Sequence, residues 1–415
     1  MKRSLYICYF GLRQPLVRTQ VIPYLQELAK GGIEVALLTF EPEMSKEWAA
    51  PEAIETERSK LAESGIKWDL RPYHKRPSAL ATAWDIFVGS LAVRKKIAAD
   101  EIDVLHGRVH VATLMGAIAR KFSSRKPKLI FDIRGFFPEE YTDAGVWPEN
   151  GLLYRSAKRV ERWLMKESDG FVVLTEKAKD LVFGEESSIP HSALRTPHFV
   201  EVIPCCVDFH ERFPSDIGSL RDEMRERLGV AGRTVYTHVG ALGGLYLTKE
   251  LADLMAAARE LDQRAFAMFL TQSDPGEIES LLKERGFSAS DMFVGRVDST
   301  EIPAYLSASD VGLSFVKATY ATQSRSPTKI PEYLAAGLPI IANSGVGDVD
   351  ELIQTEKVGL LIDKFEPEAY QNVLFRLRRL GNVSERCKEV ARRRFDLETV
   401  GGVRYRRLYD NILQS

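Results

Sequence analysis

The chain has 415 residues, enough for two or three domains with separate cores. Hydrophobic residues make up 45% of it and charged residues 28%, as in ordinary soluble globular proteins. The formal net charge of −1 argues against a protein dedicated to nucleic acid, because such domains are normally clearly basic.

The cysteine content and the lengths of the apolar runs indicate the cellular compartment in which the protein is expected. Four cysteines are too few for a disulfide scaffold, and no Cys/His spacing indicates zinc. No run approaches the roughly 18 apolar residues of a spanning helix. The first residues, MKRSLYICYF, are typical of a buried strand and not of a signal peptide. We therefore expect a cytoplasmic protein.

The chain opens with a strand–helix–strand pattern. Apolar runs at 5–10 and 35–39 flank an amphipathic segment, 18–29, which predicts the start of a parallel sheet. The first loop places Arg13 and Arg18 at the carboxyl end of the first strand, where open α/β sheets bind ligands. The two arginines could contact a ligand or could simply solvate the loop, and the sequence favours neither interpretation.

A candidate strand at 104–106 leads into the segment HGRVH, with His106, Arg108 and His110. Histidines four residues apart can bind a metal on a helix, but no acidic third ligand is nearby. A sugar or phosphate contact is favoured over a metal, and a structural role is favoured over both.

The next predicted strand, 129–133, ends in FDIRGFFPEEY. Asp132 and Arg134 lie at its end, with Glu139 and Glu140 in the loop that follows. Loops at strand ends build the active sites of α/β proteins, so this charged cluster is a candidate site. The alternative is a structural Asp–Arg pair.

The segment 154–166 predicts a strongly basic helix. Its cations are Arg155, Lys158, Arg159, Arg162 and Lys166. Basic residues mixed with Trp163 and Leu164 can rest on an anionic membrane, which predicts a peripheral contact at its inner face. The alternative is a helix that is simply solvated on one side.

A domain boundary is predicted near 205–215, where a strand ends at Pro204 and runs into an irregular loop. Strand–helix alternation then restarts. The strand at 235–239 is followed by GALGGLYLTKE, which contains three glycines and Lys249. A glycine-rich loop between a strand and a helix can cradle a phosphate, although this one matches neither of the standard nucleotide fingerprints.

The stretch 324–348 combines a polar loop, a short helix, a buried strand and a glycine turn. Loop amides at a helix N-terminus, with Lys329 beside them, favour an anion such as a phosphate. Glu332, one turn into the helix, could accept hydrogen bonds from hydroxyls. This combination suits a sugar nucleotide, and the alternative is a helix with an ordinary exposed Glu and Lys.

The alternation predicts an α/β protein with two doubly wound, Rossmann-like domains whose strand ends face a common cleft. At this point a family likeness becomes visible. The segments PTKIPEYLAAGLPIIA, VIPCCVDFHERF, VGALGGL and FDIRGFFPEEY resemble those of the family 4 retaining glycosyltransferases, which have the GT-B fold. The resemblance implies an acceptor-side domain at 1–205, a nucleotide-sugar donor domain at 206–396, and a C-terminal helix, 397–415, that crosses back to the first domain.

The resemblance also implies roles for residues of the donor half. Glu332 matches the second acid of the family's Glu-x7-Glu motif and would hold the donor ribose. The first acid falls at Ser324, which cannot supply the same charged acceptor to the sugar. The arginine of the family's glycine loop corresponds to Ala241, so Lys249 or Lys329 would supply the cation for the diphosphate, and Lys329 is the better candidate.

Arg134 matches the position of the histidine that approaches the transferred sugar in many members. The implied catalytic residues are Arg134, Asp132 and Lys329. The implied donor-binding residues are Glu332, Ser324, Arg325, Ser326, Thr328, Gly240, Gly243, Gly244 and Lys249. The expected acceptor-side residues are Arg13, Arg18, His106 and Arg108.

The implied reaction moves a sugar from a nucleoside diphosphate sugar to a hydroxyl of a glycan or lipid-linked acceptor, with retention, in polysaccharide or glycolipid assembly. Fixed amides and a lysine would stabilise the departing diphosphate, so no metal or other cofactor is expected. Two alternatives share the architecture. One is a nucleotide-sugar 2-epimerase, and the other is a catalytically silent nucleotide-binding homologue, which Ser324 supports.

Overall fold

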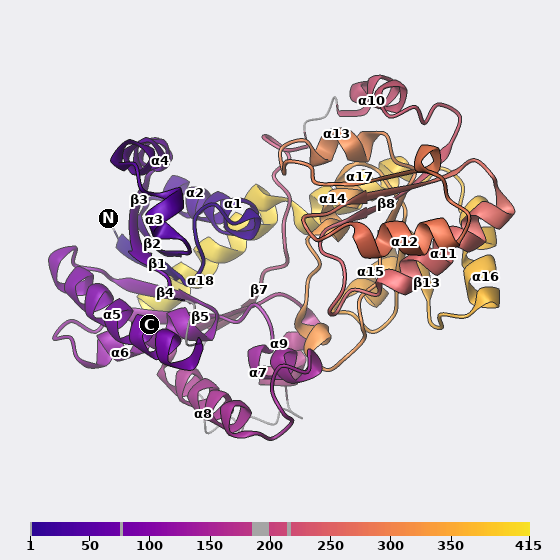
Figure 1. Cartoon of the computed structure of the whole chain (residues 1–415). Helices are drawn as coiled ribbons and strands as arrows, with labels where there is room; N and C mark the ends of the chain where they lie inside the picture. Colours follow the sequence, from indigo (N-terminus) through magenta and orange to yellow (C-terminus); the bar gives the residue numbers. More distant parts are fainter. Residues whose placement is uncertain (1, 75–77, 185–198, 214–216) are drawn as a thin grey trace. The chain divides into compact units, whose positions relative to one another are not determined.

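The computed structural model describes residues 2–74, 78–184, 199–213 and 217–415 (Figure 1). The chain forms two compact units. Unit 1 comprises Met1–Pro204 together with Gly401–Ser415, and unit 2 comprises Cys205–Val400. Each unit contains one parallel sheet covered by helices, so the predicted α/β class with two such sheets is confirmed.

The sheet of unit 1 has seven parallel strands in the order β3-β2-β1-β4-β5-β6-β7. The strands are β1 (Lys2–Cys8), β2 (Ile33–Glu41), β3 (Ile66–Pro72), β4 (Val104–Arg108), β5 (Lys128–Asp132), β6 (Gly170–Val173) and β7 (Phe199–Val202). The central strands β1 and β5 contain buried apolar runs, at 5–8 and 129–131, because helices cover both faces of a parallel sheet.

Ten α-helices of the described residues belong to unit 1. They are α1 (Pro15–Gln20), α2 (Ile22–Lys30), α3 (Met44–Glu47), α4 (Pro51–Glu63), α5 (Ser78–Ala99), α6 (Val109–Lys121), α7 (Phe137–Asp143), α8 (Leu152–Glu167), α9 (Glu176–Phe183) and α18 (Val403–Gln414). The amphipathic segment expected at 18–29 is divided into α1 and α2 at Val21. Pro23 lacks the amide hydrogen that a continuous helix would need there.

The last helix, α18, follows a π-helical turn, Leu397–Gly402, and packs on β7 and α2. Its buried face consists of Tyr405, Leu408, Tyr409 and Ile412. Residues from the end of the chain therefore complete the core of unit 1.

The sheet of unit 2 has six parallel strands in the order β10-β9-β8-β11-β12-β13. They are β8 (Thr234–Val239), β9 (Ala265–Leu270), β10 (Met292–Gly295), β11 (Val311–Ser314), β12 (Ile340–Asn343) and β13 (Gly359–Ile362). Because β8, β11 and β12 are neighbours, the loops after these three strands leave the same edge of the sheet.

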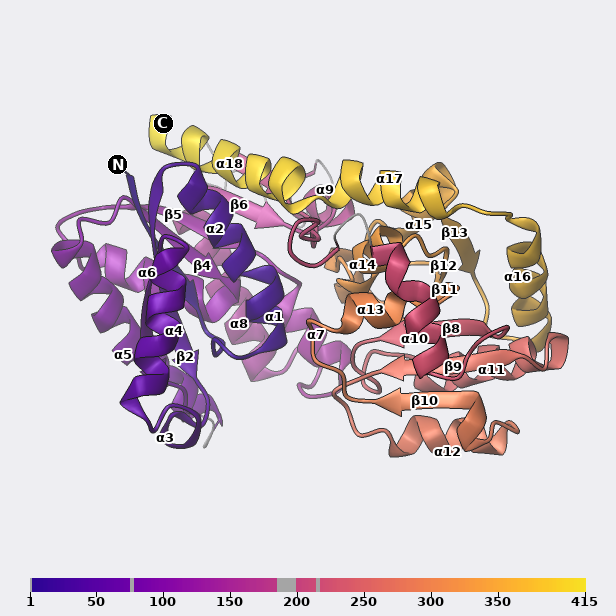
Figure 2. The same cartoon turned by 90° about the horizontal axis from the view of Figure 1, so that it is seen from above.

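Two helical layers cover this sheet (Figure 2). One apolar core joins it to α11 (Thr248–Leu261), α12 (Gly276–Glu284) and α16 (Pro367–Arg379). The other joins it to α10 (Arg221–Arg227), α13 (Ile302–Ser307), α14 (Lys329–Ala335), α15 (Val349–Glu356) and α17 (Ser384–Phe395).

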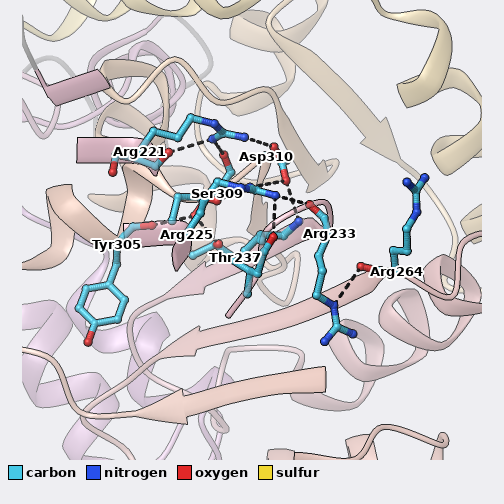
Figure 3. A network of polar contacts seen from close by, with 12 residues as sticks. Arg221, Arg225, Arg233, Thr237, Arg264, Tyr305, Ser309 and Asp310 are labelled. Atoms are coloured by element: carbon cyan, nitrogen blue, oxygen red, sulfur yellow. Dashed lines mark hydrogen bonds and ion pairs between the residues drawn. The ribbon is translucent and has the colours of Figure 1, made fainter. Parts of the chain in front are cut away.

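A polar network holds the amino ends of β8 and β11 (Figure 3). Asp310 accepts hydrogen bonds from Arg221 and Arg225, at 2.5 and 3.2 Å, and from the amide of Val235, at 2.8 Å. Thr237 of β8 and Ser309, two residues before β11, share a hydroxyl hydrogen bond of 2.6 Å. Ligands of such sheets bind at the carboxyl ends of the strands, so this arginine cluster is structural.

Candidate functional site

The glycine loop after β8 has the backbone shape that a close ligand approach requires. Gly240, Gly243 and Gly244 have φ angles of 119°, 73° and 63°, which residues with side chains rarely adopt. Three amides of this loop are engaged within the protein, and that of Gly240 donates to the carbonyl of Leu270 at 2.9 Å. The amide of Leu242 donates to Ser273 Oγ at 3.1 Å, and that of Gly243 donates to Thr248 Oγ1 at 2.9 Å.

Lys329 begins α14 and extends under this loop. Its Nζ lies 3.5 Å from His238 Nε2 and 4.7 Å from the ring centroid of Tyr246. A Cβ placed on Gly240 would lie 3.5 Å from the same Nζ, so the loop and the lysine are in van der Waals contact. Only 4% of Lys329 is exposed. Burial lowers its pKa to about 7, and the charge of Glu332 opposes this effect.

His238 is the fully buried neighbour of Lys329 at the end of β8. Its Nε2 also lies 3.2 Å from the carbonyl oxygen of Ala241. Burial, reinforced by the charge of Lys329, holds the pKa of His238 well below its usual value. A neutral imidazole can lie beside an ammonium without charge repulsion, so His238 supports the position of Lys329.

Glu332 lies one turn after Lys329 and is 9% exposed. Its Oε1 accepts a hydrogen bond of 2.6 Å from Arg212 Nη1, and Arg212 Nη2 donates to the carbonyl of Ser299 at 3.2 Å. The alternative of an ordinary exposed Glu and Lys is therefore wrong. The sequence indicated no role for Arg212, because its partner is 120 positions away.

Tyr333 fixes α14 against the sheet. Its hydroxyl donates to the carbonyl of Leu313 at 3.1 Å and accepts from the amide of Val239 at 2.9 Å. A Cβ on Gly312 would lie 2.4 Å from the ring of Tyr333, so the glycine in β11 allows this packing. Tyr333 thereby sets the height of Glu332 above the strand ends.

The loop before α14 contains the remaining predicted donor residues except Lys249. Ser324 is buried, and its hydroxyl donates to the carbonyl of Ala321 at 2.6 Å. Ser326 Oγ accepts from the amide of Cys205 at 3.1 Å. Arg325 and Thr328 are partly exposed in this loop, and Lys249 is exposed at the start of α11.

In unit 1, Asp132 is the centre of a buried network at the end of β5. Its Oδ2 accepts from Arg134 Nε at 2.9 Å, from the hydroxyl of Tyr6 at 3.2 Å and from that of Tyr405 at 3.3 Å. Burial opposes ionisation of this carboxyl group. The charge of Arg134 and the hydrogen bond from His106 outweigh it and hold the pKa of Asp132 well below its usual range.

His106 and Arg108 belong to the same network and are almost completely buried. His106 Nδ1 lies 3.0 Å from the hydroxyl of Tyr409, and Arg108 Nη1 donates to the hydroxyl of Tyr6 at 3.4 Å. The structure therefore brings Asp132, His106 and Arg108 together with Arg134, whose Nη2 donates to Tyr405 at 2.9 Å.

Arg13 and Arg18 are placed elsewhere in unit 1, and Arg18 lies in α1 and not in the predicted first loop. The guanidinium of Arg13 stacks on the ring of Trp48, 4.1 Å from its centroid. Arg18 Nη2 forms an ion pair of 3.1 Å with Glu57. Within residues 2–74, 78–184, 199–213 and 217–415, no group of three or more His, Cys, Asp or Glu residues could hold a metal ion.

Two family models match the sequence. A glycosyl transferase 4-like domain matches residues 17–191, and a glycosyl transferases group 1 domain matches residues 236–379. None of the curated proteins compared matches the chain.

Solved structures of similar fold extend over the whole chain. Sucrose-phosphate synthase from Thermosynechococcus elongatus superimposes with a TM-score of 0.73 at 16% identity, covering 100% of both chains. HepE of Anabaena, in complex with UDP-glucose, superimposes with a TM-score of 0.68 at 16% identity, covering 99% of this chain and 100% of that one. WaaG, a glycosyltransferase involved in lipopolysaccharide biosynthesis, superimposes with a TM-score of 0.65 at 16% identity. The match covers 98% of this chain and 99% of that one.

The two family matches lie in the two units, one in each, and the whole chain has the fold of these glycosyltransferases. The resemblance seen in the four sequence segments is thereby confirmed. The chain belongs to the family 4 glycosyltransferases, which are retaining enzymes of the GT-B fold that use nucleotide sugars.

Proposed function

We propose that this enzyme extends a glycan or a lipid-linked acceptor during polysaccharide or glycolipid assembly, with unit 2 binding the donor and unit 1 the acceptor. The observation that carries the donor assignment is the buried Lys329 beneath the glycine loop, with Glu332 one turn further along α14. An anion and a hydroxyl-bearing ring are the two chemical groups that this pair suits.

In the proposed reaction the bond between the anomeric carbon and the diphosphate breaks as the acceptor oxygen bonds to that carbon. The acceptor proton passes to the departing diphosphate. The ammonium of Lys329 stabilises the charge that develops on this leaving group, in a site from which burial excludes much of the water. Glu332 accepts hydrogen bonds from the ribose, while Arg212 orients its carboxylate.

Arg134 would approach the transferred sugar from unit 1. Its guanidinium is already oriented by hydrogen bonds to Asp132 and Tyr405, so Asp132 acts as a positioning partner. Ser324 stands where a carboxylate would contact the donor sugar, and a serine cannot make that charged contact. This favours a second candidate, a homologue that binds a nucleotide without transferring a sugar.

The test uses UDP-glucose as the first donor, because the similar HepE holds it. NMR should show UDP-glucose consumed only when a glycan or lipid-linked acceptor is added, with a product that keeps the anomeric configuration. Conversion without any acceptor would assign the protein to the 2-epimerases. Binding without turnover over a panel of donors and acceptors would assign it to the silent homologues.

Donor affinity is expected to depend on pH through Lys329. Its pKa of about 7 in the free protein means that the neutral amine predominates at higher pH. A bound diphosphate favours the ammonium, so the Kd for UDP-glucose should be constant below about pH 7 and rise by up to about tenfold per pH unit above it. Titration calorimetry between pH 6 and 9 measures this.

The matched control for this prediction is Lys329→Arg, because a guanidinium stays charged over the whole interval. Its Kd should change little with pH, whatever its absolute value. A wild-type Kd that is equally flat from pH 6 to 9 would contradict the assignment of Lys329 to the diphosphate.

We also propose that α8 makes a peripheral contact with the inner, cytoplasmic face of a membrane. No helix among the described residues is both long and apolar enough to cross one. The first turn of α8 exposes Leu152 and Leu153, and Arg155, Arg159 and Arg162 are exposed further along the helix. Lys158 is bound by Glu139 and Glu161 and would contribute little.

A further inference from the structure

The helix α5 exposes a continuous apolar stripe. Leu80, Trp84, Phe87 and Leu91 follow one another at intervals of four, three and four residues, which places them on one face of a helix. Their exposed fractions lie between 49% for Leu91 and 72% for Leu80. Trp84 and Phe87 are in contact, with ring centroids 5.9 Å apart. Single exposed apolar residues are common, but a row of four on one helix marks an interaction site.

The opposite face of α5 is fixed, so the stripe cannot rotate inward. Asp85 is buried on that face and accepts hydrogen bonds from the hydroxyl of Tyr9, at 2.7 Å, and the amide of His74, at 2.9 Å. A Cβ on Gly89 would lie 2.5 Å from the sulfur of Met115, so α5 and α6 are packed in close contact. The stripe is therefore a permanent feature of the surface of unit 1.

The charges of α5 indicate what the stripe contacts. Asp85 is the only acidic residue of the helix, and it is buried. Arg94 and Lys95 are exposed three and four residues after Leu91, so they continue the same face. Apolar side chains that include a tryptophan, followed by cations and without any exposed acid, fit the interface of an anionic lipid bilayer.

The area of the stripe argues against a second copy of the chain. Four partly exposed side chains can bury at most a few hundred Å². A stable protein–protein interface buries about 800 Å² on each partner. A lipid surface needs no such area, because a few inserted side chains and the attraction of cations to lipid phosphates act together.

We propose that α5 inserts Trp84 and Phe87, flanked by Leu80 and Leu91, into the interfacial layer of an anionic membrane. Arg94 and Lys95 bind the phosphates of lipid headgroups at the end of the stripe. This extends the proposed contact through α8 but does not depend on the transfer reaction. The helix α6 contacts both α5 and α8, so the two surfaces belong to one helical layer of unit 1 (Figure 1).

The experiment is co-flotation of the full chain with vesicles of phosphatidylcholine, with and without phosphatidylglycerol. Wild-type protein should float with the anionic vesicles, less so at high salt.

Trp84→Ser/Phe87→Ser should lower the partition coefficient by about tenfold or more. Trp84→Phe should retain binding. Arg94→Gln/Lys95→Gln should weaken binding to the anionic vesicles only. The matched control is Phe375→Ser on α16, which removes an equally exposed ring, 51%, from unit 2.

Three outcomes would overturn the proposal. The first is equal flotation of the wild type and Trp84→Ser/Phe87→Ser, with unchanged circular dichroism. The second is a loss of binding that occurs only in Arg155→Gln/Arg159→Gln, which would assign the contact to α8 alone. The third is a wild-type dimer, seen by light scattering, that Trp84→Ser/Phe87→Ser dissociates. Lys329→Ala should float like the wild type, so failure of the proposed function and failure of this proposal are separable.

Discussion

Replacing Lys329 by alanine should lower kcat/KM for donor-dependent transfer by about 10²–10³-fold. The ammonium is buried beneath the glycine loop, where a charge interacts more strongly with a developing diphosphate than it would in water. The loss should be larger in kcat than in KM, because the leaving group gains charge as the bond breaks. Initial rates over a series of UDP-glucose concentrations measure both.

Lys283→Ala provides the control, since this lysine is exposed on α12 and pairs only with Glu279 on the same helix. Its kinetics should match those of the wild type. Lys249→Ala distinguishes the two cations considered for the diphosphate. Because Lys249 is exposed at the start of α11, Lys249→Ala should lower kcat/KM by less than about tenfold. If Lys329→Ala retained normal turnover while Lys249→Ala lost it, the assignment within unit 2 would be reversed.

Replacing Arg134 by glutamine should lower the free energy of unfolding of the protein by about 3 kcal/mol at neutral pH. Asp132 would remain buried and charged without its nearest cation. Urea denaturation followed by circular dichroism measures the loss. Asp132→Asn/Arg134→Gln should recover part of it, because the buried carboxylate that Arg134 compensates is then removed as well. If Arg134→Gln were as stable as the wild type, the ion pair of Asp132 and Arg134 would contribute nothing to the free energy of unfolding.

The same variant, although less stable at neutral pH, should be less sensitive to acid than the wild type. In the wild type the folded-state pKa of Asp132 is depressed. Its contribution to stability is therefore present above the unfolded pKa of about 3.9 and lost as pH falls through the lower folded value. Without Arg134 the folded pKa rises towards the unfolded value, so the variant should lose less of its remaining stability than the wild type as pH falls. Denaturation curves between about pH 2 and 8 compare the two proteins.

The local patterns of the sequence predicted the architecture well. Apolar runs separated by amphipathic segments indicated strands and helices in alternation, which is sufficient for two parallel sheets. The glycine loop at 240–244 and the start of α14 were also visible, because positive φ angles and helix starts have local signatures. Pro23 was visible too, but its effect on the helix at 18–29 was not anticipated.

What could not be predicted are side-chain environments created by distant residues. Glu332 and Lys329 were recognised by type, but their burial depends on packing against β8 and β11. The partnership of Arg212 with Glu332, and that of His106 with Tyr409, join positions 120 and 303 residues apart. Periodicity contains no information about such pairs, since it reports only which face of an element is apolar.

The position of α18 has a consequence for the order of events during synthesis. Unit 1 consists of the first and the last residues of the chain, whereas unit 2 is one uninterrupted segment between them. Tyr405 and Tyr409, which complete the network around Asp132 and His106, leave the ribosome after all of unit 2. Unit 2 can thus fold while unit 1 still exposes part of its core, and chaperones would bind the nascent chain at that uncovered surface.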